Sequence, residues 1–282
     1  MTLSRPLPSG LHRPSQPAQP APVAPSSVDV LGVPLSVTDY DDTMEWMDAS
    51  IAHGQKGYVC VAATHTIMVC GEDPELREAV LGASMTVPDG QPLVWAMNAL
   101  GDAVLEERVY GPELMARYCE RAAQNGTRMY LYGGRNQGAL VQLALNLRHR
   151  FPGVKIVGGY SPPFRELSDE EEDAIVAEMN GSRADVIWVG VGAPKQEKWM
   201  AAMRDRLDAP VLVGVGAAFD FHAGLVAQAP HWMQSAGLEW SFRLAHEPRR
   251  LWRRYARYNP RFVAGFTRQY VRHRMHSPPP ER

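Results

Sequence analysis

The chain has 282 residues, 45% of them hydrophobic, and a net charge of -2. This length allows one substantial hydrophobic core, or one core with an appendage. No apolar run approaches the roughly 20 residues of a membrane-spanning helix, which argues against an integral membrane protein.

Residues 1–27 are rich in Pro, Ser, Gln and Ala. So few apolar side chains do not offset the cost of ordering, and we expect a disordered lead without a secretory signal. The three cysteines, Cys60, Cys70 and Cys119, form no CxxC pair. They indicate reduced thiols of a cytosolic protein rather than a metal or redox site.

After this lead, apolar runs alternate with helical patterns. Strands are predicted at 57–63, 84–87, 128–132, 154–157, 186–189 and 211–215. Helices are predicted at 74–83, 91–100, 113–124, 170–180, between Gly134 and Arg150, and from Pro194 onward. Strands separated by helices of this length imply βαβ units, so we expect an α/β domain with a mostly parallel sheet.

From Gly237 onward the pattern predicts helices only. Pro248 suits the first turn of a helix, and Pro260 is expected to end that helix and begin a second one. Residues 240–276 hold ten arginines and one acidic residue, Glu247, so their net charge is +9. A segment of this charge binds an anionic partner or lies on an anionic surface.

The predicted C-terminal helices have an aromatic face, formed by Phe262, Phe266 and Tyr270, beside their arginines. This pattern is compatible with an interfacial membrane helix. The alternative is a helical pair that docks on the core and exposes its basic face to water. The expected organisation is a lead at 1–27, an α/β domain at 28–236, an arginine-rich helical appendage at 237–276 and a tail at 277–282.

In an open parallel sheet, ligands bind beyond the carboxyl ends of the strands. Several predicted strands are followed by polar or glycine-rich residues, notably Thr64-His65, Pro88-Asp89-Gly90 and Gly133-Gly134. Taken alone, Asp89 is an ordinary turn aspartate and His65 a core histidine. The two glycines fit either a close backbone approach to a ligand or a tight turn.

Lys195 opens a predicted helix, where a cation opposes the helix dipole, and this favours a ligand role for it. No HxH, HExxH or DxD arrangement is present, so we expect neither a catalytic metal nor a cofactor. The absence of GxGxxG weakens one alternative, a nucleotide-binding oxidoreductase. Another alternative is a binding module whose basic tail engages nucleic acid.

Eight short motifs follow one another along the chain. They are DPEL at 73–76, PDGQPLVW at 88–95, ERVYG at 107–111, YSPPF at 160–164, GAPKQE at 192–197, GVGAAFD at 214–220, LEW at 238–240 and EPRRLWRR at 247–254. In content and order they resemble the WecG/TagA/CpsF glycosyltransferase family, over about residues 30–270.

The resemblance implies an inverting, metal-independent enzyme with a Rossmann-like domain, helices on both faces of its sheet, and a C-terminal appendage. Such an enzyme moves N-acetylmannosamine or a related sugar from UDP to an undecaprenyl-diphosphate-linked acceptor in polysaccharide assembly. It would be cytoplasmic and bound to the inner face of the membrane through its C-terminal helices, without a nucleic-acid partner. By analogy, a homo-oligomer is compatible with the family.

The resemblance also implies roles for individual residues. Asp89 matches the proposed base, and Arg108, Gln196 and Asp220 match residues of the donor and acceptor pocket. An inverting transfer needs a carboxylate to take the acceptor proton, and arginines can bind the departing diphosphate bidentately. The arginines expected to do so are Arg243, Arg249, Arg250, Arg253 and Arg254.

One motif departs from the family. Many members carry Thr-x-Asn at the end of the first strand, whereas residues 62–65 read Ala-Ala-Thr-His. Either Thr64 and His65 make the donor contacts, or the donor sugar differs. Gly133, Gly134 and Lys195 complete the predicted binding residues.

Overall fold

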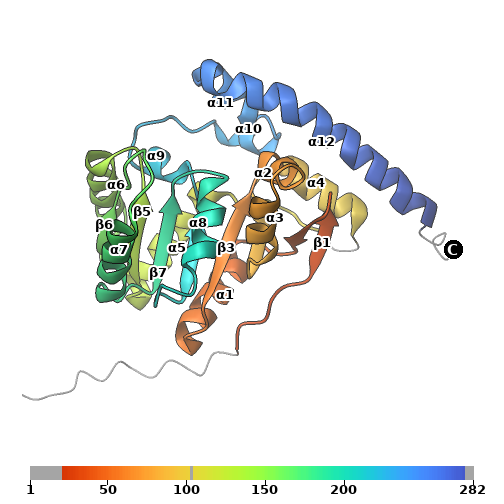
Figure 1. The fold of residues 1–282 in the computed structure, drawn as a ribbon. Helices are drawn as coiled ribbons and strands as arrows, with labels where there is room; N and C mark the ends of the chain where they lie inside the picture. The colour runs from red at the N-terminus through yellow and green to blue at the C-terminus, as the bar shows by residue number, and fades with distance from the viewer. Residues whose placement is uncertain (1–20, 102–103, 277–282) are drawn as a thin grey trace, which may run out of the picture.

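The computed structural model describes residues 21–101 and 104–276. Within these residues, the main sheet has six parallel strands in the order β4-β3-β8-β7-β5-β6. Figure 1 shows β6, β5, β7 and β3 of this sheet. The strands are β3 (Gly57–Ala62), β4 (Met85–Pro88), β5 (Arg128–Gly133), β6 (Lys155–Tyr160), β7 (Val186–Gly190) and β8 (Val211–Gly214). The predicted parallel α/β sheet is therefore confirmed.

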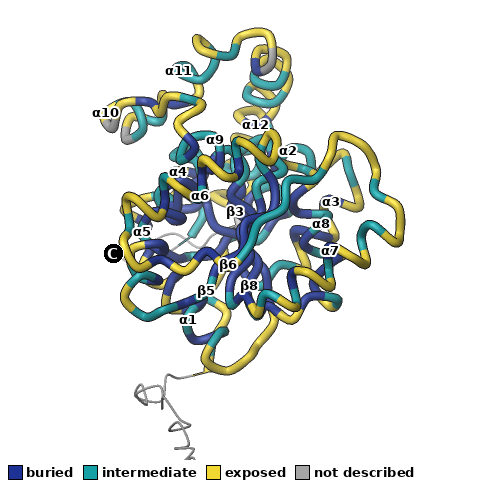
Figure 2. The backbone as a smooth tube through the Cα atoms, turned by 90° about the vertical axis from the view of Figure 1, so that its left-hand side faces the viewer, coloured by how far each residue is buried: buried dark blue, intermediate teal, exposed yellow. Residues whose placement is uncertain are grey.

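Helices cover both faces of this sheet, because alternate strand residues feed two separate hydrophobic clusters. One face packs against α1 (Tyr40–His53), α5 (Gly111–Asn125), α6 (Gln137–Arg150) and α9 (Ala218–His222). The other face packs against α2 (Thr64–Cys70), α3 (Pro74–Leu81), α4 (Gln91–Leu100), α7 (Asp169–Gly181) and α8 (Lys195–Met203). Figure 2 shows the buried strands at the centre of the molecule.

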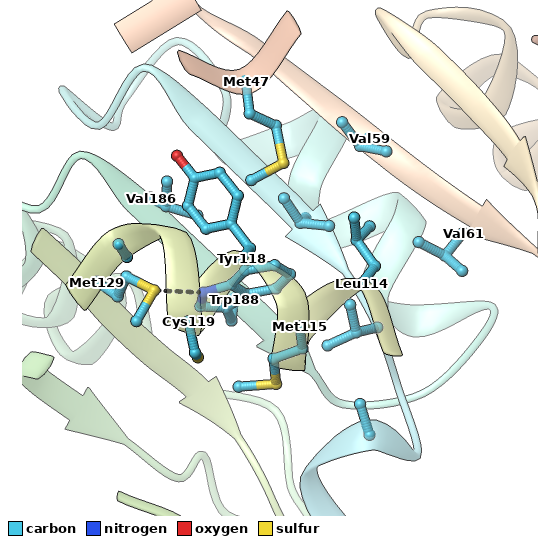
Figure 3. Close-up of a cluster of buried hydrophobic side chains, with 14 of the residues drawn as sticks. Met47, Val59, Val61, Leu114, Met115, Tyr118, Cys119, Met129, Val186 and Trp188 are labelled. Atoms are coloured by element: carbon cyan, nitrogen blue, oxygen red, sulfur yellow. Dashed lines mark hydrogen bonds between the residues drawn. The ribbon is translucent and has the colours of Figure 1, made fainter. Parts of the chain in front are cut away.

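Trp188 on β7 is fully buried in the first of these clusters (Figure 3). Its indole Nε1 lies 3.1 Å from the sulfur of Met129 on the neighbouring strand β5. The ring of Tyr118 meets the indole edge-on, with 5.8 Å between the ring centroids. These contacts join α5 to the middle of the sheet, and α5 begins at the carboxyl ends of the strands.

A two-stranded hairpin precedes the main sheet and was not predicted. It consists of β1 (Ser27–Val30) and β2 (Val33–Ser36), joined by a turn at Leu31 and Gly32 that has positive φ at both residues. Its turn residues, Leu31 and Gly32, are not one of the residue pairs that typically signal a two-residue hairpin. The segments 1–20 and 277–282, most of the predicted lead and the whole tail, lie outside the described residues.

Beyond β8 the chain forms α10 (His231–Ser235), α11 (Glu239–His246) and α12 (Pro248–His276). The prediction that Pro260 separates two helices was wrong, because α12 continues through it. A proline within a helix removes one backbone hydrogen bond. Burial of Leu251 before Pro260 and of Phe262 after it offsets this loss, since α12 packs along α2 and α4 on both sides of the proline (Figure 1).

Close backbone packing explains one of the glycines at the strand ends. Gly133 pairs with Gly190 of β7, and a Cβ at Gly133 would lie 2.5 Å from the Gly190 carbonyl carbon. Its φ of +133° is also a conformation that side-chain-bearing residues rarely adopt. Packing between two strands therefore requires glycine at this position, whether or not a ligand approaches it.

Gly133→Ala is expected to lower the free energy of unfolding by about 3 kcal/mol, through overpacking and backbone strain. Urea denaturation measures this effect. The matched control is Gly181→Ala, because a Cβ there meets nothing within 4 Å at the end of α7. The control should be neutral or slightly stabilising. Equal midpoints for the two variants would contradict the packing explanation.

Candidate active site

A cavity of about 580 Å³ opens at the carboxyl ends of β3, β4 and β8, beneath α11 and α12. The strand ends and the turns after them form its floor, and the C-terminal helices form one wall. Half of the predicted site residues line it, namely Thr64, His65, Asp89, Arg108, Gln196, Arg243 and Arg254. The fold thus brings together residues that are up to 190 positions apart in sequence.

Asp89 follows the last residue of β4 and is held from two sides. Its backbone N–H donates to the Ala62 carbonyl (2.9 Å), and its Oδ1 accepts from the N–H of Gly111, the first residue of α5 (3.0 Å). Burial raises the pKa of Asp89 to about 6, against the opposing effect of Arg108 and with a further rise from Glu239. A carboxylate with this pKa is suited to accept a proton near neutral pH.

Arg108 is paired within the protein. Its Nη2 donates to Glu239 Oε2 (2.7 Å) and to Gln234 Oε1 (3.1 Å), and its guanidinium carbon lies 4.2 Å from the centre of the Tyr110 ring. Both partners of the ion pair expose only 11% of their side chains. Because Glu239 begins α11, Arg108 connects the core to the C-terminal helices at the cavity wall.

Glu239 and Tyr110 line the cavity but were not predicted as site residues. Glu239 had a usable signal, because it is an acidic residue immediately before the basic segment and lies within the LEW motif. Tyr110 also lies within one of the motifs, ERVYG, but a tyrosine there is ordinarily a core residue. Burial raises the pKa of its hydroxyl, and the neighbouring Glu239 and Asp89 raise it further.

Arg243 on α11 and Arg254 on α12 carry unused hydrogen-bond donors. The Nε of each guanidinium is buried and lacks a partner within the described part of the chain. Arg243 lies 5.9 Å from the centre of the Phe221 ring, and Arg254 lies 5.3 Å from that of Tyr255. Two cations with free N–H groups in one cavity form a candidate site for a phosphate group.

Gln196 contributes an amide to the cavity floor. Its Nε2 donates to Glu197 Oε1 (2.9 Å), while its own Oε1 is buried without a partner among the described residues. The side chain lies against Gly216, whose Cβ would be 3.3 Å from this oxygen. Gln196 therefore presents a hydrogen-bond acceptor to the cavity.

Two helices begin at the cavity without a side-chain cap, α2 after Ala63 and α4 after Gly90. The first N–H groups of a helix have no intrahelical partner and carry partial positive charge. Thr64 is the first residue of α2. The N-termini of these helices thus add to the positive potential that Arg243 and Arg254 create in the cavity.

His65 lies beside Tyr258 of α12, with their rings edge-on and 5.0 Å between centroids. Burial lowers the pKa of His65 to about 4, and the nearby Arg254 lowers it further. The imidazole is therefore neutral near pH 7, so it offers a substrate hydrogen-bonding groups and no charge.

A family model described as the glycosyl transferase WecG/TagA/CpsF family matches residues 28–276, most of the chain. The protein belongs to this family. It is therefore a glycosyltransferase, with a sugar donor and an acceptor as substrates. Membership favours this reaction over the oxidoreductase and the binding module considered above.

Other predicted residues of this WecG/TagA/CpsF protein lie outside the cavity lining. Asp220 forms two hydrogen bonds with Arg135 (2.9 and 3.1 Å), and Lys195 is exposed at the start of α8. Six of the predicted residues do not line the cavity, namely Gly133, Gly134, Lys195, Asp220, Arg249 and Arg253. The side chain of Arg250 is outside the described part of the structure. Roles in substrate binding for all of these residues stay predictions.

Proposed function

We propose that the protein transfers a sugar, with inversion, from a UDP-sugar to a polyprenyl-diphosphate-linked acceptor, and that Asp89 is the general base. The observation that carries this proposal is the arrangement of Asp89, with its pKa raised to about 6, in one cavity with the unpaired Nε groups of Arg243 and Arg254. This combination matches a reaction that removes a proton at one end and releases a diphosphate at the other.

In the proposed step, an acceptor hydroxyl attacks the anomeric carbon on the face opposite the diphosphate. The new carbon–oxygen bond forms as the bond to UDP breaks, and the hydroxyl proton passes to the Asp89 carboxylate. The electron pair of the broken bond leaves with UDP. Arg243, Arg254 and the N-termini of α2 and α4 stabilise that developing charge, so the protein's own groups supply the positive charge the step requires.

The acceptor lipid is supported by the surface around the cavity. Trp95 and Trp240 line the cavity yet expose 54% and 41% of their surface, and Trp252 on α12 exposes 52%. In the described residues no helix is long and apolar enough to cross a membrane. Exposed tryptophans beside arginines suit an anionic membrane surface. We propose docking at the inner face of the cytoplasmic membrane, with an undecaprenyl chain as the acceptor lipid.

The donor is proposed to be UDP-N-acetylmannosamine or a related UDP-sugar. A panel of UDP-sugars, offered with a short-chain lipid-diphosphate sugar, tests the reaction class and the donor together when UDP release and glycosylated product are both measured. Equal rates with and without a metal chelator are expected. Absence of product with every donor and acceptor in the panel would overturn the proposed function.

Activity is expected to fall as the pH drops through about 6. The folded pKa of Asp89 lies above its ordinary value, so the reactive carboxylate is present above about pH 6 and is lost below it. Titration of His65 does not contribute to the change in activity near pH 6, because its pKa is about 4. A profile of kcat/KM from about pH 5 to about pH 8 measures the effect. Flat activity down to pH 5 would contradict the raised pKa.

A further inference from the structure

One of the contacts that attach the long helix α12 to the core involves a carboxylate outside the cavity. Glu72, in the loop between α2 and α3, accepts hydrogen bonds from three described side chains of α12. Its Oε2 accepts from Arg257 Nη2 (2.8 Å) and the Tyr258 hydroxyl (3.1 Å), and its Oε1 accepts from Arg261 Nη1 (2.5 Å). Desolvation opposes this arrangement, but the three donors lower the pKa of Glu72, so it is ionised near pH 7.

The three donors lie on a single turn of α12 that borders the cavity. Tyr258 lines the cavity and also packs against His65. Arg254 and Phe262 lie one turn before and one turn after Tyr258, and both line the cavity as well. A contact that fixes the rotation of α12 at Tyr258 therefore also fixes the direction in which Arg254 points.

The apolar contacts of α12 restrict the rotation of the helix about its axis less tightly than the hydrogen bonds to Glu72 do. Leu251 and Phe262 are buried, but apolar contacts are non-directional and tolerate a small rotation or shift of the helix. Hydrogen bonds to a carboxylate are directional, and charged donors make them stronger. Toward its C-terminal end, α12 makes another directional contact with the core, because Gln269 Nε2 donates to the carbonyl oxygen of Asp29 (2.8 Å). This contact lies about two turns beyond Arg261 and therefore farther from the cavity than the contacts of Glu72.

We propose that Glu72 is a positioning residue, which docks α12 on the core and so holds Arg254 over the cavity. In this arrangement Arg257 and Arg261 bind the protein itself rather than an external anion. The proposal concerns the docking of the helix and does not depend on the sugar or lipid. Only its effect on turnover rests on the proposed function.

The proposal is tested by exchanging the charges of the pair. Glu72→Arg places a cation against Arg257 and Arg261, and Arg257→Glu with Arg261→Glu places two acids against Glu72. Each change is expected to speed amide hydrogen exchange in residues 251–262 about tenfold, as expected for loss of a small ion-pair network. The triple variant restores opposite charges and should recover most of the protection. The strands of the sheet should exchange at the wild-type rate throughout.

The matched control is Glu75→Arg, because Glu75 is an exposed acid on the neighbouring helix α3 that pairs with Lys198 rather than with α12. It should leave exchange in α12 unchanged, and Lys198 keeps its contact with Asp73 (2.8 Å). In the sugar-transfer assay, Glu72→Arg should lower kcat about tenfold, with recovery in the triple variant. If Glu72 did not position α12, Glu72→Arg would neither speed amide exchange in α12 nor lower kcat.

Three results would overturn the proposal. These are unchanged exchange of α12 in Glu72→Arg, faster exchange of the whole sheet, and no recovery in the triple variant. If the wild-type protein transferred no sugar in any assay, the proposed function would fail, yet the exchange results would still decide the role of Glu72. Loss of transfer in Glu72→Arg without faster exchange in α12 would point to a direct contact with substrate instead.

Discussion

Replacement of Asp89 by asparagine is expected to reduce kcat by a factor of about 10²–10⁴, the range typical for loss of a general base. The amide cannot accept the acceptor proton, so the attacking hydroxyl stays protonated while its bond to the anomeric carbon forms. UDP binding should be nearly unchanged, because the positive groups of the cavity, Arg243 and Arg254, are untouched. Product formation under donor saturation and UDP titration by calorimetry measure the two properties.

Asparagine is the informative substitution because it preserves the local structure. Its Oδ1 can still accept the hydrogen bond from the Gly111 N–H, which fixes the start of α5. The melting temperature should therefore change little, or rise slightly, because a buried ionisable group has been replaced by a neutral one. Transfer at the wild-type rate would remove Asp89 from the role of base. Loss of UDP binding together with activity would indicate a structural role instead.

The sheet was predictable because its strands are short apolar runs between longer helical patterns. Residues 57–62 are buried at every position, as expected for a central parallel strand, and the predicted and observed bounds differ by one residue. The hairpin of β1 and β2 was not predictable in the same way. Its turn places Leu31 at a positive φ, against the local preference of leucine, and its packing depends on α12 from the other end of the chain.

The position of the candidate site was predictable from the sequence, but which arginines line it was not. Asp89 and Gln196 follow strands, and the rule for parallel sheets places such residues at one edge. The basic segment offers many arginines at helical spacing, and sequence alone does not reveal which of them face inward. A break at Pro260 would have made the two halves independent. Because α12 is continuous, Arg254 lies on the same side of the helix as the buried Leu251 and Phe262.

The position of each arginine around its helix decides whether it faces the cavity or the solvent. Arg254 and Arg243 point into the cavity, while Arg249 and Arg253 are exposed on α12. Arg108, which the family resemblance assigns to the pocket, is neutralised by Glu239. In the proposed reaction, the net positive charge available to the departing diphosphate would therefore come chiefly from the C-terminal helices. We accordingly expect catalysis to depend on the docking of these helices to the α/β core.

Replacement of Arg254 or Arg243 by glutamine should therefore lower kcat by about 10²-fold or more, the typical cost of removing one group that stabilises developing charge. This factor corresponds to about 2.7 kcal/mol of lost transition-state stabilisation. The variant Arg254→Lys should be intermediate, because it keeps the charge but loses the bidentate geometry. Kinetics with a short-chain acceptor in detergent separate this effect from membrane binding.

Arg268→Gln is the matched control for Arg254→Gln, because Arg268 is an exposed arginine of the same helix that does not line the cavity. It removes the same charge from α12 and should leave kcat within about twofold of wild type, since exposed charges are screened. Equal losses in the two variants would show that α12 acts through its overall charge. A loss confined to Arg254→Gln and Arg243→Gln, with normal melting temperatures, would place the diphosphate between these two side chains.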